Sequence, residues 1–159
     1  MYSTISTFSF EAAHRLHDVN TYSDECRKCL HGHSYKLTVK VSRKELNDAG
    51  MVIDFKLLKK VVNDTIINVY DHSSILRDTD PITESIKENC EKVNVVEENP
   101  TAEWMCGYFY YLLNNAFTEL DPELIVAEIR VQETENNVAS CTSDQFITLE
   151  SRDDGMIYA

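Results

Sequence analysis

Residues 26–33 read Cys-Arg-Lys-Cys-Leu-His-Gly-His and hold two of the five cysteines and two of the five histidines of the chain. The run after them, residues 35–41 (Tyr-Lys-Leu-Thr-Val-Lys-Val), alternates apolar and polar side chains and predicts a half-buried β-strand. Carried backwards, this period of two places His31 and His33 on the apolar face at the end of the strand. Gly32 leaves the backbone between them free to approach a bound group closely. Two imidazoles on one face can hold a small cation, usually zinc, although a packed pair of histidines explains the same spacing.

A third histidine has the same relation to the preceding strand. Residues 4–14 predict a strand in which His14 shares the phase of Phe10 and Ala12, so its ring also lies on the apolar side near the strand's end. A single buried, hydrogen-bonded histidine is the simplest interpretation of such a residue. The two histidines in the equivalent place on the next strand favour a shared metal site instead.

Length and composition limit the classes of function. The 159 residues, with 43% hydrophobic residues, predict one domain (1–159) with a real core. No apolar run is long enough for a membrane span, and nothing resembles a signal peptide. A net charge of −12 argues against nonspecific nucleic-acid binding but leaves an anionic small-molecule substrate possible. Five cysteines without a repeating framework favour the reducing cytoplasm.

The remaining periodic segments define the fold class. Apolar residues at helical spacing predict a helix over 55–69, with Asp54 as its N-cap, and a second helix with Pro100 in its first turn that ends at Asp121. A short helix near 82–89 interrupts an acidic stretch whose structure the pattern leaves open. The further segments are strands at 124–133 and 145–150 and a tail at 151–159. The order of two strands, two helices and two strands predicts an α+β domain: a four-stranded antiparallel sheet with both helices, which lie between strands 2 and 3, on one face.

Two more groups are candidates for a site. Glu133 continues the apolar row of its strand, and a buried carboxylate is costly without a partner. Asp71 and His72 follow the first helix directly, although such a pair is also common on surfaces. Three histidines, one or two thiols, this pair and Glu133 together predict a metal-assisted active site without naming its reaction.

Six short motifs in a fixed order carry a family resemblance. They are residues 10–16 (Phe-Glu-Ala-Ala-His-Arg-Leu), 30–35 (Leu-His-Gly-His-Ser-Tyr), 50–59 (Gly-Met-Val-Ile-Asp-Phe, then Leu-Leu-Lys), 71–72 (Asp-His), 99–103 (Asn-Pro-Thr-Ala-Glu) and 133–139 (Glu-Thr-Glu-Asn-Asn-Val-Ala). The chain resembles the 6-pyruvoyl-tetrahydropterin synthase superfamily, and most of all its queuosine-pathway branch, the 6-carboxy-tetrahydropterin synthases.

The resemblance implies a set of roles. It implies a tunnelling fold, a homohexamer of two stacked trimers with active sites between subunits, and 7,8-dihydroneopterin triphosphate as substrate. The product implied by the queuosine branch is 6-carboxy-tetrahydropterin, with release of acetaldehyde and triphosphate. By position, His14, His31 and His33 match the zinc ligands, Glu133 the carboxylate that anchors the pterin, and Asp71 with His72 the pair that works with a cysteine in proton transfer.

The thiol and the phosphate-binding groups stay open. The queuosine-branch pattern has three residues between the cysteine and His-Gly-His; here Cys26 has four and Cys29 has one. Cys26 is the favoured catalytic thiol, because the stretch reads as the family sequence with Cys29 inserted. The candidates for binding the triphosphate are Arg15, Arg27, Lys28 and Lys36.

Three other functions remain as alternatives. Cys26 and Cys29 could join His31 and His33 in a closed structural zinc site, which would make the protein a binding module. A biopterin-type synthase would eliminate triphosphate and keep the three-carbon side chain. An enzyme that cleaves the side chain of dihydroneopterin for folate synthesis has a glutamate near the cysteine position, and Glu25 precedes Cys26.

Overall fold

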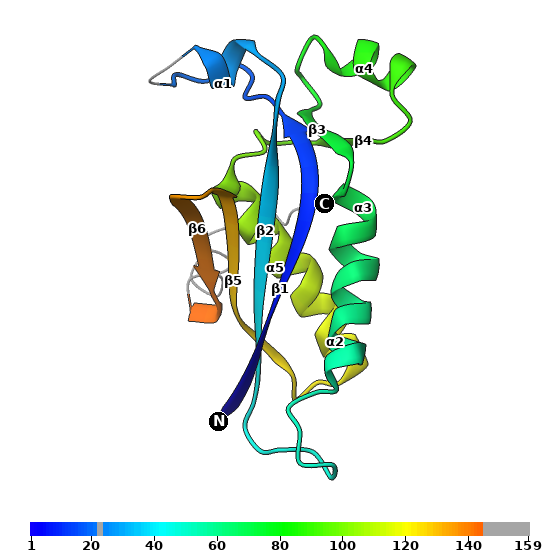
Figure 1. Cartoon of the computed structure of the whole chain (residues 1–159), viewed down its shortest axis with the longest axis vertical. Coiled ribbons are helices and arrows are strands. Elements are labelled where there is room, and N and C mark those ends of the chain that lie inside the picture. Colours follow the sequence, from blue (N-terminus) through cyan, green and yellow to red (C-terminus); the bar gives the residue numbers. More distant parts are fainter. Residues whose placement is uncertain (22–23, 145–159) are drawn as a thin grey trace, which may run out of the picture.

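The computed structural model describes residues 1–21 and 24–144 as a twisted sheet with its long helices on one face (Figure 1). The strands are β1 (Tyr2–His14), β2 (His31–Arg43), β3 (Ser73–Arg77), β4 (Val93–Val96), β5 (Ile125–Thr134) and β6 (Asn137–Thr142). The helices are α1 (Glu25–Lys28), α2 (Phe55–Val62), the π-helical turn η1 (Asn63–Ile67), α3 (Asn68–Tyr70), α4 (Thr83–Asn89) and α5 (Ala102–Leu120).

The sheet confirms the α+β class and corrects the strand count. Its order is β4-β3-β1-β2-β5-β6, so it has six strands rather than four. The pairs β1–β2, β2–β5 and β5–β6 are antiparallel, whereas β3 pairs in parallel with β1 and β4 with β3. The short strands β3 and β4 lie in the stretch whose structure the pattern left open. The strand predicted at 145–150 lies outside the described residues.

The first long helix forms where the sequence predicts it and contains one wider turn. Asp54 Oδ1 accepts the backbone N–H of Lys56 at 2.7 Å and of Leu57 at 3.3 Å, which confirms the predicted N-cap. Helix α2 then continues through η1 into α3, so the helical segment ends at Tyr70. A π-helical turn inside a helix is uncommon and is frequent near functional sites. Here it precedes Asp71 by one short helical turn.

The second long helix begins later than predicted. Thr101 caps α5 by accepting the N–H of Trp104 at 3.1 Å, so Pro100 precedes the helix instead of forming its first turn. The predicted end at Asp121 is confirmed, because Asp121 is the extended C-cap residue.

A bulge changes the phase of β5. Residues Ile129 and Val131 are buried as predicted, but Ile125 is 40% exposed and Val126 takes its place in the core. Lys40 of β2 faces Glu128, but the next residue, Val41, faces Val126. Ala127 is therefore an extra residue on β5, and it forms the bulge that shifts the register.

The core fills the space between the sheet and the two long helical segments. Tyr35, Leu37 and Val39 from β2 are fully buried. Phe10 stacks on Tyr35 with ring centroids 5.0 Å apart, and Phe109 of α5 meets Phe10 edge-on at 6.1 Å. The apolar rows of β1 and β2 therefore lead straight to His14 and His33, and the packed core holds the strands that carry them.

We expect Phe109→Ala to lower the free energy of unfolding by about 3–5 kcal/mol, because it opens a cavity between the sheet and α5. Phe55→Ala is the matched control, since Phe55 is 59% exposed and its loss should change stability by less than about 0.5 kcal/mol. Urea unfolding followed by circular dichroism measures both. Equal losses in the two variants would contradict this account of the core.

Candidate functional site

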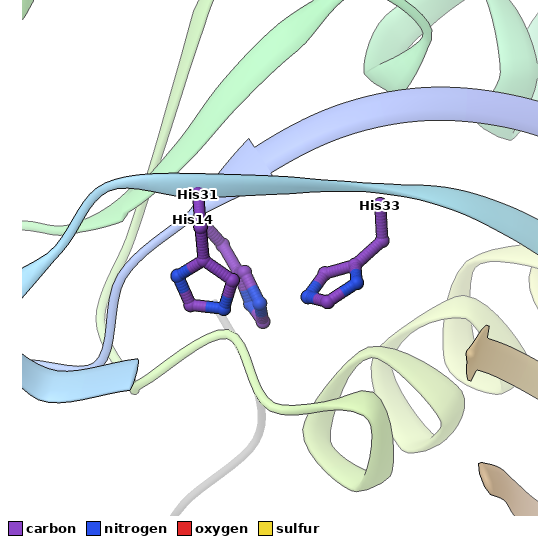
Figure 2. A group of neighbouring side chains, drawn as sticks. All are labelled: His14, His31 and His33. Carbon is purple, nitrogen blue, oxygen red and sulfur yellow. The ribbon is translucent and has the colours of Figure 1, made fainter. Parts of the chain in front are cut away.

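The three histidines meet at the end of the β1–β2 pair. In the register of this pair His14 faces His31 and Ala12 faces His33. Figure 2 shows the three rings on one side of the strands, turned toward the segment that leads into α5. Their ring centroids lie 4.7–5.1 Å apart, and each ring offers a nitrogen within 4.8 Å of the others. The alternation in the sequence thus predicts a real cluster.

Backbone carbonyls fix the orientation of two of the rings. His14 Nδ1 lies 2.7 Å from the carbonyl oxygen of Pro100, and His31 Nδ1 lies 2.9 Å from that of Cys29. A carbonyl can only accept, so in each ring Nδ1 carries the proton. The lone pair at Nε2 is then free for a metal ion, which is the usual arrangement around metal-binding histidines.

The Nε2 atoms lack partners of their own. Those of His14 and His33 are buried, and neither makes an aligned hydrogen bond within the described part of the chain. Burial lowers the pKa of His33 and so favours the neutral imidazole that binds metals. Buried unpaired nitrogens are costly, and a metal ion at this place would satisfy them. Among residues 1–21 and 24–144 this cluster contains no thiol, which favours the open three-histidine site over the closed one with cysteines.

Glu133 joins the cluster as predicted. Its Oε1 lies 3.2 Å from His14 Nε2 and 3.7 Å from His33 Nε2. The neighbouring histidines, His14 foremost, hold the pKa of the Glu133 carboxyl below its usual value against the effect of burial. Because neutral His14 uses its proton at Nδ1, its Nε2 and the carboxylate are two acceptors facing each other. Such a contact is favourable only with a proton or a cation at Nε2.

Asp71 and His72 lie apart from the cluster, at the side of β1. Asp71 Oδ1 accepts the N–H of Glu11 at 2.8 Å, and the N–H of His72 donates to the Glu11 carbonyl at 2.6 Å. Asp71 Oδ2 lies 2.9 Å from His72 Nδ1, so the carboxylate orients the imidazole as predicted. The Glu11 N–H is the main cause that lowers the pKa of Asp71. Lys92 Nζ donates to the Asp71 carbonyl at 2.6 Å and holds the segment in place.

The imidazole of His72 points into a different space from the three histidine rings. Its backbone has the left-handed φ of 58°, and its side chain is 79% exposed. It lines a hollow of about 790 Å³ whose lining also includes Glu11, Ser34 and the cluster residue His33. Glu11 and Ser34 alternate with Ala12 and His33 along their strands, so the side chains of Glu11 and Ser34 lie on the sheet face opposite the histidine rings. Within one subunit, the described structure does not bring Asp71 and His72 into the histidine cluster.

The two candidate thiols lie on and beside α1, beyond the ends of β1 and β2. Cys26 is partly buried, and its carbonyl accepts the N–H of Leu16 at 3.0 Å. The Cys29 side chain is exposed, and its carbonyl is the group that orients His31. The contribution of Cys29 to the cluster is therefore made by its backbone.

The interpretation of the sequence missed the backbone and side-chain groups that position the histidine cluster. The Pro100 carbonyl orients His14, and the adjacent Asn99 side chain accepts the N–H of His17 at 2.6 Å and donates to its carbonyl at 2.8 Å. The Asn99-Pro100 motif is recognisable in the sequence, but a single sequence does not show which strand end the motif contacts.

Comparison with known proteins decides the family. The sequence matches the 6-pyruvoyl tetrahydropterin synthase family over residues 4–144, which is most of the chain. The chain belongs to this family. A 6-carboxy-5,6,7,8-tetrahydropterin synthase of Rickettsia felis is 34% identical over 131 residues, which cover 80% of this chain and 90% of the relative. A protein of the same name from Aquifex aeolicus is 34% identical over 151 residues, covering 84% and 93%.

Solved structures show the same fold. A protein of Wolinella succinogenes described as uncharacterized superposes with a TM-score of 0.71 at 24% identity, covering 89% of this chain and 98% of that one. The 6-pyruvoyl tetrahydropterin synthase of Caenorhabditis elegans superposes with a TM-score of 0.63 at 24% identity, covering 89% and 95%. None of the helices in the described structure has the length and apolar character needed to span a bilayer.

We expect His14→Ala and His31→Ala each to abolish metal binding, because each removes one of three converging Nε2 ligands. His17→Ala is the control, since it removes a histidine from the adjacent loop that contributes no ligand to the cluster. Elemental analysis of the purified variants measures the metal content. Full zinc retention in His14→Ala, with loss only in Cys26→Ala or Cys29→Ala, would establish the closed site instead.

Proposed function

We propose that the protein is a zinc-dependent carbon–carbon lyase that converts 7,8-dihydroneopterin triphosphate to 6-carboxy-5,6,7,8-tetrahydropterin. Acetaldehyde and triphosphate are the other products, and the pathway is that of queuosine and related 7-deazaguanines. The carrying observation is the arrangement of Glu133 beside His14 and His33 in a cluster whose three rings offer converging nitrogens. The names of the relatives at 34% identity support the choice of product.

The chemistry requires proton movements along a three-carbon side chain. One carbon stays on the ring as the carboxyl group, two leave as acetaldehyde, and one water is consumed. Each of these steps needs a polarised oxygen and a base that takes or returns a proton at the adjacent carbon.

Different residues would polarise the substrate oxygen, hold the pterin ring and transfer the protons. When bound by His14, His31 and His33, zinc would supply Lewis acidity to the side-chain oxygens of the substrate. Glu133 accepts paired N–H groups from the guanidine-like edge of the pterin and so fixes the ring. Cys26 serves as the base that moves protons.

His72 is the partner of the thiol in this proposal, and Asp71 orients it and stabilises its charged form. Because His72 faces away from the histidine cluster of its own subunit, the two sets would meet across a subunit contact. A homohexamer of two stacked trimers supplies such contacts. The outermost strands of the described sheet, β4 and β6, leave backbone groups that pairing between subunits would satisfy.

A cytoplasmic location is part of the proposal. None of the five cysteines forms a disulfide within the described residues, and a catalytic thiolate needs a reducing compartment to stay active.

A biopterin-type synthase is the second candidate. It would begin with the same polarisation and proton transfers but keep all three side-chain carbons after triphosphate leaves. The spacing of Cys26 does not separate the two candidates, because the four residues between this thiol and His31 are one more than in the queuosine pattern and one fewer than in the biopterin-type pattern.

Identification of the pterin product separates the two candidates. We expect the zinc-loaded protein to give 6-carboxy-tetrahydropterin by mass spectrometry, with one equivalent of acetaldehyde for each triphosphate released. A product that retains three side-chain carbons, without acetaldehyde, would replace this proposal with the biopterin-type reaction. Protein with His14→Ala is the control for reactions that do not need the site.

We expect Cys26→Ala to reduce kcat by about 10²–10⁴-fold, the usual loss when a general base is removed. Cys29→Ala is the matched control, because Cys29 acts on His31 through a carbonyl that the substitution keeps. Both variants should retain zinc. If Cys29→Ala is the inactive variant while Cys26→Ala turns over normally, the catalytic thiol is Cys29.

A further inference from the structure

A second hollow, of about 580 Å³, opens beyond the histidine-bearing ends of β1 and β2. It gathers three basic side chains from two segments, Arg15 on one side and Arg27 with Lys28 of α1 on the other. His17, Asp18 and Asn20 complete most of its lining. Each of the three basic groups is paired with a carboxylate, Arg15 with Asp80 and both Arg27 and Lys28 with Asp24.

The walls of the hollow are tied together and to the metal site. The N–H of Leu16 donates to the Cys26 carbonyl at 3.0 Å and links the two basic segments. Arg15 donates through two nitrogens to the buried carboxylate of Asp80, and its side chain is only 13% exposed. The two hydrogen bonds between Asn99 and His17 fix the adjoining backbone. Arg15 is therefore held in place before any ligand binds.

The hollow also lies in line with the other parts of the site. Arg15 follows His14 directly, and Lys28 lies three residues before His31, so both walls continue from metal-ligating strand ends. Glu133 lies on the neighbouring strand β5 and contacts His14 and His33. Figure 1 shows α1 beyond the ends of β1 and β2, the ends at which His14 and His31 lie.

We propose that this hollow binds the triphosphate of the substrate through Arg15, Arg27 and Lys28. The inference rests on the proposed function and adds to it the subsite that the sequence left open. A ligand anchored by its pterin at Glu133, with its hydroxyls at the histidines, would extend its third side-chain carbon toward these cations. Arginine and lysine are the usual partners of phosphate oxygens, arginine through paired hydrogen bonds.

The same geometry excludes Lys36 from this role. Lys36 lies on β2 in the phase of Ser34, which donates to Glu11 on the face opposite the histidine rings. It is therefore the matched control for the effect of removing a positive charge from the same region of the chain.

Carboxylates around the hollow set the strength of binding. Asp24 accepts hydrogen bonds from both Arg27 and Lys28, and these cations lower the pKa of Asp24 to about 2, so it is charged at neutral pH. Asp18 also lines the hollow. Ion pairs between exposed groups contribute little, so a polyanion can take Arg27 and Lys28 away from Asp24. Asp24 is then a competitor of the phosphate, and its removal should tighten binding.

Inorganic tripolyphosphate is the probe, titrated calorimetrically into the zinc-loaded protein at fixed ionic strength. We expect the double variant Arg27→Ala/Lys28→Ala to bind at least about tenfold more weakly, since two charge-assisted contacts are lost. Asp24→Asn should bind about twofold to fivefold more tightly, and Lys36→Ala should match the unchanged protein. Elemental analysis of each sample confirms equal zinc content, so that a change in affinity does not report lost metal.

Opposite results would overturn the inference. It fails if tripolyphosphate does not bind, if the double variant binds as the unchanged protein does, or if Lys36→Ala weakens binding as much as the double variant. Weaker binding by Asp24→Asn would also overturn it, because Asp24 would then support the ligand instead of competing with it.

Kinetics separate a failure of this subsite from a failure of the proposed reaction. With 7,8-dihydroneopterin triphosphate the double variant should raise KM with a much smaller change in kcat, whereas its affinity for dihydroneopterin without phosphates should be unchanged. A different product with the same tripolyphosphate pattern would reject the reaction and keep the subsite. The expected product with an unchanged KM in the double variant would reject the subsite and keep the reaction.

Discussion

The antiparallel pairing of β1 with β2 is the constraint on which the site depends. It runs in unbroken register from Tyr2 opposite Arg43 to His14 opposite His31. A slip of one residue would turn the rings of one strand to the opposite face and dismantle the cluster. The close approach of the two strands also limits what fits at Gly32, where an added Cβ would lie 3.3 Å from the Ala12 carbonyl oxygen. The core fixes this register, because the same alternation buries Phe10 and Tyr35.

The second requirement is that loops reach the strand ends from elsewhere in the chain. The carbonyl of Pro100 comes from the connection before α5, and that of Cys29 from the end of α1. Each carbonyl holds the ring proton at Nδ1 of its histidine, so the free lone pair of that ring is at Nε2. Two ordinary backbone hydrogen bonds thus orient two of the three rings of a group that could hold a metal ion, and a well-packed sheet lies behind them.

The parts that could be predicted from the sequence are those that depend on local periodicity. Alternation predicted that His14, His31 and His33 share a face, and the same rule put Glu133 at the end of its row. The rule failed at Ile125, because a bulge on β5 changes the phase without any glycine or proline to mark it. It also missed β3 and β4, whose parallel pairing joins segments that are far apart in the chain and whose alternation is too short to recognise. The choice among the four basic candidates for the triphosphate needed the fold, since the sequence does not show that Arg15, Arg27 and Lys28 line one hollow.

The division of the site between two faces of the sheet carries a consequence for how the family's chemistry can work in this chain. The helix-facing side holds the three histidines and Glu133, where His14 is buried and burial lowers the pKa of His33. The other side holds His72, exposed and oriented by Asp71. In the proposed function, the position of Asp71 and His72 outside the histidine cluster would keep them from becoming further ligands and would leave a coordination position for a substrate oxygen. Under that proposal a second subunit has to complete the site, so assembly and catalysis would depend on each other through the exposed side of His72.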